Sequence, residues 1–232
     1  MRLALLFSLL WAAPVLSQDI VALFAAVPDK YLEPLTNATG KPLPAARRTA
    51  IAEAAPERRA GVARADGLRD VVIDRSGGYL RLASDTDGEG VVLEATYWKQ
   101  KDGARLLALA ISSWTMSTEA TEAVRFLRFN GPRCDDVTAA TLPDLRISRF
   151  YAKRGPAVTA AERAGLVWRW TLPRKGTTIL IEAPTLDDEP GMPAGGKPDF
   201  AFEMRWQGNG FESVRIPAPA EQIGRPSCRE RV

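Results

Sequence analysis

The feature that most constrains the fold is a run of short segments between residues 71 and 216 in which apolar and polar side chains alternate. A period of two residues is typical of a strand with one buried face. Asp-Gly at 102–103 and Asn-Gly at 130–131 lie between such segments and favour tight hairpins, because glycine adopts positive φ angles without strain. The clearest strand is 200–207, one face of which would carry Phe200, Phe202, Met204 and Trp206.

Short turns between successive strands argue against parallel pairing, because parallel neighbours need a crossover of a dozen or more residues. We expect about nine to eleven strands in the region that alternates. Segment 146–152 is expected to be one of them, and 184–199, rich in Pro, Gly and acidic residues, is expected to be a surface loop or lid.

Helical periodicity is confined to the start of the chain. It is present at 20–27, behind the capping residue Asp19, and in the Ala-rich stretch 45–55. The polar stretch 57–68 is expected to be a connection. The sequence predicts an α+β, mainly β fold with short N-terminal helices packed on an antiparallel β-meander, sandwich or barrel-like.

Residues 1–17 have the pattern of a signal peptide. Arg2 precedes a short apolar run, Pro14 interrupts it, and small residues precede a cleavage site after Ser17. The apolar run is too short to span a bilayer. We therefore expect a periplasmic or extracellular protein without a membrane span, in which 18–217 form a single α+β domain.

The tail 218–232 is expected to lie outside that domain. Residues 223–232 resemble translated sequencing adapter, which would make them non-native; the alternative is a genuine basic tail whose Cys228 could pair with Cys134. The whole chain has 31 basic and 28 acidic residues, a net charge of +3. Without 1–17 and 223–232 each sign numbers 27, so net charge gives no reason to expect nucleic acid as a partner.

The chain contains no histidine. This excludes Ser-His-Asp and Cys-His catalysis and every metal site that needs an imidazole ligand. No glycine-rich phosphate loop is present, and we expect no cofactor. Cys134, the one cysteine before the tail, is either buried and inert or a free thiol.

Carboxylates remain as candidates for chemistry. Asp85, Asp87 and Glu89 alternate around a glycine and could bind Ca²⁺, although they lack the remaining ligands of an EF-hand; ordinary turn chemistry explains the same residues. Further acids occur at 135–136 and 187–189. Two acids from different loops could run a glycosidase mechanism, which needs no histidine.

Trp168 and Trp170 are the aromatic candidates for ligand binding. They alternate around Arg169 and so share one face of a predicted strand. If that face is exposed, the rings could stack on sugars or on peptide side chains. If it is buried, they fill the core, where large aromatic side chains supply much of the apolar area.

Several short segments of the chain carry a resemblance to known proteins: 18–29, 78–82, Trp98 with 108–111, 124–126, and the closing hairpin 206–211. In these the chain resembles a family of exported bacterial proteins of unknown function. The resemblance implies a fold of the kind described above and no particular activity.

Three classes of function are compatible with these features. The first is a non-catalytic envelope or secreted module that binds a protein, a peptide or a glycan. The alternative is a histidine-free, glycosidase-like hydrolase that uses paired carboxylates. The third is a purely structural accessory subunit. An exposed aromatic patch would favour binding, and two acids facing each other would favour the hydrolase.

Overall fold

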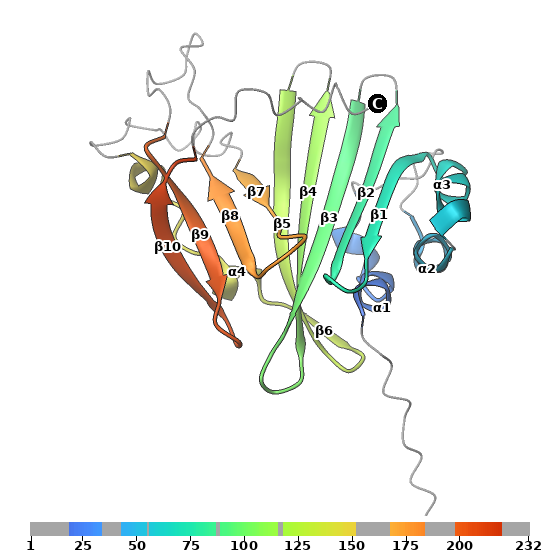
Figure 1. Cartoon of the computed structure of the whole chain (residues 1–232), viewed down its shortest axis with the longest axis horizontal. Coiled ribbons are helices and arrows are strands. Elements are labelled where there is room, and N and C mark those ends of the chain that lie inside the picture. Colours follow the sequence, from blue (N-terminus) through green and yellow to red (C-terminus); the bar gives the residue numbers. More distant parts are fainter. Residues whose placement is uncertain are drawn as a thin grey trace, which may run out of the picture.

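The chain folds into two antiparallel sheets with a few short helices, an α+β, mainly β architecture (Figure 1). The computed structural model describes residues 19–33, 43–54, 56–86, 89–115, 118–151, 168–183 and 198–219. Within each sheet, strands that follow one another in the chain are neighbours. The predicted antiparallel meander is confirmed, and it is divided between two sheets.

The six-stranded sheet comes first in the chain and the four-stranded sheet second. Gly103 and Gly131 turn two hairpins of the first sheet with φ angles of +87° and +58°, as their Asp-Gly and Asn-Gly pairs predict. The strands of the first sheet are β1 (Leu68–Asp74), β2 (Tyr79–Thr86), β3 (Glu89–Lys99), β4 (Arg105–Thr115), β5 (Thr118–Asn130) and β6 (Arg133–Asp136). Those of the second are β7 (Arg169–Thr171), β8 (Thr178–Glu182), β9 (Phe200–Trp206) and β10 (Phe211–Pro217).

The helices before β1 are α1 (Ile20–Ala25), the 3-10 turn η1 (Asp29–Tyr31), α2 (Ala45–Glu53) and α3 (Pro56–Arg64). The short turns α4 (Thr138–Thr141) and η2 (Ile147–Phe150) follow β6. α1 begins where the sequence predicts: Oδ1 of Asp19 accepts hydrogen bonds from the main-chain N–H groups of Val21 and Ala22 at 3.1 and 3.0 Å.

The six-stranded sheet lies between the N-terminal helices α1–α3 and the four-stranded sheet (Figure 1). Strand β4 shows why, because its apolar run is buried on both faces. Leu107, Leu109 and Ile111 pack in the cluster that contains the helices. Leu106, Ala108 and Ala110 point the other way and pack in the cluster that contains β8 and β9. A run such as 106–111, which is apolar at every position, needs cover on both sides.

Arg48 of α2 ties the helices together from inside the core, where it is only 1% exposed. Its guanidinium donates to the carbonyl oxygens of Ala25 and Val27 at the end of α1, at 3.1 and 2.8 Å, and to that of Leu43 at 2.8 Å. An ion pair with Asp29 measures 2.7 Å. Carbonyl groups at the end of a helix have no hydrogen-bond donor within the helix, and Arg48 supplies those donors.

Aromatic rings join the two sheets at one end. The ring of Phe211 lies edge-on to Trp98 of β3, with centroids 4.8 Å apart, and Trp206 lies 5.1 Å from Phe211. Beside them, Nε2 of Gln100 donates to the carbonyl of Asn209 at 3.1 Å. The β3–β4 and β9–β10 hairpins are therefore held against each other by both apolar and polar contacts.

Two local predictions are wrong. Segment 57–68 was expected to be a connection, but α3 occupies most of it. Pro56 suits the first turn of a helix, and a side chain at Gly61 would meet open space, so neither residue breaks the helix. Segment 146–152 was expected to be a strand but contains η2, because Phe150 turns inward to pack at 4.8 Å on Phe202 of the second sheet.

Candidate functional site

The second sheet covers only part of the outer face of the first. The residues of the first sheet that pack against it come from β3, β4 and β5. On the same face, β1, β2 and the middle of β3 carry polar side chains, whereas Leu80 and Leu82 point to the helices. We call this area the open half-face and define it by Asp70, Val72, Asp74, Tyr79, Arg81 and Glu94.

Register places these residues side by side. Asp74 pairs with Tyr79 across β1 and β2, and Arg81 pairs with Glu94 across β2 and β3. Val72 is the other cross-strand partner of Arg81. Directly opposite side chains in an antiparallel pair have Cβ atoms about 5 Å apart, so this surface is built by strand pairing itself.

Hydrogen bonds and ion pairs connect four of these side chains into a network. The Tyr79 hydroxyl donates to Oε1 of Glu94 at 2.5 Å. Nη1 of Arg81 donates to Oδ2 of Asp70, and Nε of Arg81 lies 4.0 Å from Oε1 of Glu94. Burial of the Tyr79 phenol, with the nearby Glu94 charge, raises its pKa. The network therefore extends from Tyr79, which is buried at 5% exposure, to Asp70, which is exposed.

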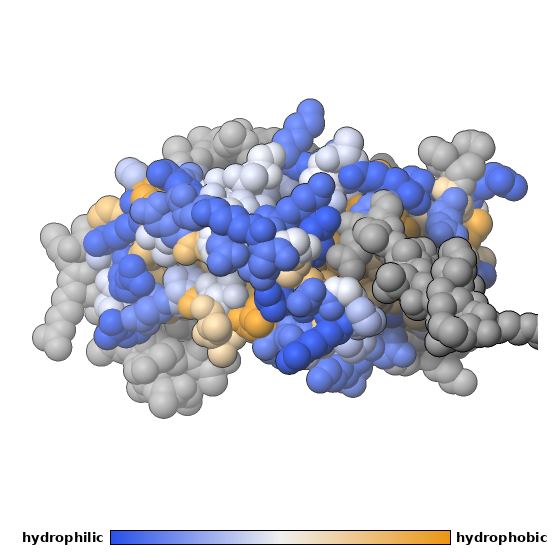
Figure 2. All heavy atoms as spheres, turned by 90° about the horizontal axis from the view of Figure 1, so that it is seen from below, coloured by the Kyte–Doolittle hydropathy of each residue, from blue (hydrophilic) through white to orange (hydrophobic). Residues whose placement is uncertain are grey.

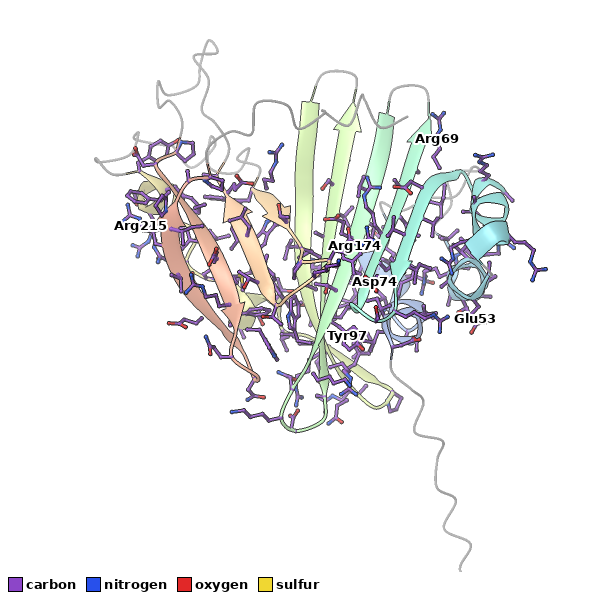
Figure 3. The ribbon with its side chains drawn as sticks, viewed as in Figure 1. Glu53, Arg69, Asp74, Tyr97, Arg174 and Arg215 are labelled. Atoms are coloured by element: carbon purple, nitrogen blue, oxygen red, sulfur yellow. The ribbon has the colours of Figure 1, made fainter. Side chains whose placement is uncertain are left out.

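Arg174, from the turn between β7 and β8, lies beside this area and points toward Asp74 (Figure 3). Its Nε is 3.9 Å from Oδ2 of Asp74. Oδ1 of Asp74 accepts hydrogen bonds from the N–H of Gly77 and from the hydroxyl of Ser76, at 2.8 and 2.7 Å. The Gly77 and Ser76 hydrogen bonds lower the pKa of Asp74, which keeps it ionised beside Arg174.

The turn between β1 and β2 positions Asp74 and is itself anchored to the helices. Nη1 of Arg75 donates to Oδ2 of Asp19, the N-cap of α1, at 2.9 Å. On the other side, a Cβ at Gly77 would lie 2.7 Å from the carbonyl oxygen of Arg174. This turn thus touches both the helix layer and the second sheet.

Two of the three predicted calcium ligands, Asp85 and Glu89, lie at the ends of β2 and β3 that are far from the β1–β2 turn. Asp85 lies in β2, where it pairs with Gly90, and Glu89 lies in β3. Asp87 lies outside the described residues, and the side chains of Asp85 and Glu89 are not described, so this site stays a prediction. Among the residues that the structure does describe, no group of three or more acidic or cysteine side chains could hold a metal ion.

Trp168 and Trp170 do share one face, and that face points to the first sheet. Trp170 is buried in the cluster between the sheets, and the half-buried Trp168 packs 4.8 Å from Phe150. Of the two, Trp168 is the more exposed. Figure 2 shows that, from below, hydrophilic residues dominate the described surface and hydrophobic ones form small separate areas.

The remaining candidates for a functional site are Cys134 and the acidic clusters. Cys134 is half-buried, and burial, with the charges of Asp135 and Asp136, raises the pKa of its thiol, which disfavours the reactive thiolate. The acids at 187–189 lie outside the described residues, as does the tail 220–232.

Sequence reasoning did not single out the network. Tyr79 and Arg81 alternate with Leu80 and Leu82, which indicates a strand with one polar face. The position of Glu94 opposite Arg81 depends on the register of β2 with β3, and the alternation by itself does not determine it.

Comparison with protein-family models, with curated proteins and with solved structures gives no match for this chain. The resemblance to an exported bacterial family therefore stays a prediction. No helix in the described ranges is long and apolar enough to cross a membrane.

Proposed function

We propose that this chain is an exported, non-catalytic binding or accessory module that functions in the periplasm or outside the cell. Its partner is a protein, a peptide or a glycan, and the open half-face is the surface that binds it. Export rests on the signal-like pattern of residues 1–17.

The network of Asp70, Arg81, Glu94 and Tyr79 is the observation that carries this proposal. Arginine and carboxylate side chains bonded to one another are held in place, so a polar partner meets groups that are already oriented. The network also borders the second sheet and Arg174, which gives a partner two elements to contact.

Three carboxyl groups among the described residues are unsuited to the acid role of a hydrolase. A glycosidase needs one carboxyl group with a raised pKa to act as general acid. In this protein hydrogen bonds lower the pKa of Asp74 and Asp102, from Gly77 and Ala104 respectively. Burial acts to raise the pKa of Asp136, but hydrogen bonds from Thr138 and Tyr31 outweigh it, and the pKa is lowered. These three groups are suited to stay ionised.

A thermal-shift panel of glycans, peptides and divalent ions tests the proposal. The double variant Asp70→Asn/Arg81→Gln, called the network variant below, removes the Asp70–Arg81 ion pair. Arg133→Gln/Asp135→Asn removes a matched exposed ion pair, 2.8 Å long, on β6 at the opposite edge of the same sheet. A ligand at about 100 times its Kd stabilises a protein by about 2.7 kcal/mol.

We expect one ligand class to raise the melting temperature of the wild type and of the β6 variant but not of the network variant, without being cleaved. Release of product from a glycan would instead support the hydrolase. Equal shifts in all three proteins would place the binding surface elsewhere, and no shift with any ligand would favour a structural subunit.

A further inference from the structure

Two groups at the centre of the open half-face have hydrogen-bonding capacity that the described residues leave unused. Arg81 uses Nη1 for Asp70, and its Nε and Nη2 make no hydrogen bond to another described residue. Glu94 accepts from Tyr79 through Oε1, and its Oε2 has no such donor in the same ranges. Both side chains reach solvent, at 27% and 25% exposure.

Neighbouring side chains hold these two groups in place. Asp70 binds Arg81 from β1, and Tyr79 binds Glu94 from β2. Arg81 and Glu94 are themselves direct cross-strand partners. A donor and an acceptor therefore lie next to each other in a preorganised arrangement, so a ligand that meets both loses little additional freedom on their side.

Charge limits which ligand can use this pair. A lone carboxylate would bind Arg81 but would be repelled by Glu94 and Asp70. A lone cation would be attracted by those two carboxylates but repelled by Arg81. Arg174 and Asp74 beside the network also form an oppositely charged pair. The surface therefore suits a neutral group that accepts on one atom and donates from the next.

A primary carboxamide has this arrangement, because its carbonyl oxygen accepts while its NH₂ group donates on the same side. In a trans secondary amide, such as a peptide bond or the acetamido group of a sugar, the N–H points away from the oxygen. We infer that Arg81 and Glu94 form a site for the side-chain carboxamide of Asn or Gln presented by a polypeptide partner, a conclusion that rests on the proposed function. Arg81 donates to the carboxamide oxygen, and Oε2 of Glu94 accepts from its NH₂.

NMR titration tests this assignment with three blocked tripeptides. The probes are N-acetyl-Gly-Asn-Gly-N-methylamide and its counterparts with Asp or with side-chain N-methylated Asn in the middle. The readout is the Nε–H resonance of Arg81, identified by its loss in Arg81→Lys. We expect the Asn peptide to shift this resonance and the other two to bind at least about tenfold more weakly, since each loses one charge-assisted hydrogen bond.

Glu94→Gln is the matched variant. It keeps an oxygen to accept from Tyr79 but replaces the Oε2 acceptor with an NH₂ donor. An otherwise unchanged amide spectrum with at least about tenfold weaker binding of the Asn peptide is expected. No shift with the Asn peptide, or equal shifts with all three, overturns the carboxamide assignment. If the network variant still loses binding in the ligand panel, the proposed function stands; if it does not, the proposed function falls as well.

Discussion

The ring of Tyr97 lies against Gly78 at the start of β2, so closely that a Cβ on Gly78 would come within 2.8 Å of Cε1 of Tyr97. Gly78 also has a φ angle of +67°, which residues with a side chain rarely adopt. Both conditions require glycine at this position. The turn that follows Asp74 therefore depends on the absence of a side chain at Gly78, as it does at Gly77.

Gly78→Ala should destabilise the protein by about 2–4 kcal/mol, from backbone strain together with the clash against Tyr97. Gly103→Ala is the matched control, because Gly103 has a φ angle of +87° but open space around a Cβ. It should cost only the strain, about 1–2 kcal/mol. Urea unfolding measures both, and equal losses would show that the Tyr97 contact is unimportant.

Arg48→Met should destabilise the protein by about 3 kcal/mol, because it leaves the carbonyls of Ala25, Val27 and Leu43 without their buried donor. Arg64→Met, on the exposed end of α3, should stay within about 0.5 kcal/mol of the wild type. Urea unfolding again provides the measurement. Similar losses in the two variants would contradict the role of Arg48 as the link between α1 and α2.

The strands could be predicted from the sequence, because alternation and turn chemistry are local. Segment 200–207 alternates without interruption and is found as β9. Segment 146–152 does not alternate in this way, because two polar residues separate Ile147 from Phe150. η2 forms there, and Phe150 packs on Phe202. Such contacts join residues about fifty positions apart, which a pattern of near neighbours does not contain.

The candidate site depends even more on long-range pairing. The alternation around Arg169 is compatible with Trp170 as a ligand platform and with Trp170 as core. Its burial follows from which face of the first sheet the second sheet covers. Asp70, Arg81 and Glu94 are ordinary polar residues of strands until three strands are placed in register. The sequence therefore indicates a polar strand face but not which charges meet on it.

Asp136→Asn should weaken the protein at pH 7 but have little effect near pH 2. Hydrogen bonds from Thr138 and Tyr31 outweigh burial and lower the pKa of Asp136 in the folded state. A lowered pKa stabilises the fold above the unfolded value, about 3.9, and this contribution is lost as the pH falls through the folded value. Urea unfolding between pH 7 and 2 should show the two proteins converging. A constant difference over that range would contradict the assignment.

Tyr79→Phe should have its largest effect below pH 10. The phenol of Tyr79 is buried and bonded to Glu94, and both raise its pKa in the folded protein. A raised pKa contributes stability below the unfolded value, about 10, and this contribution is lost as the pH rises toward the folded value, because only the unfolded chain then releases the proton. The stability gap between wild type and Tyr79→Phe should therefore narrow above pH 10, by up to about 1.4 kcal/mol per pH unit. Urea unfolding from pH 7 to 11 measures the gap. If the stability gap keeps its full size at pH 11, the folded protein does not hold the Tyr79 phenol in its protonated form.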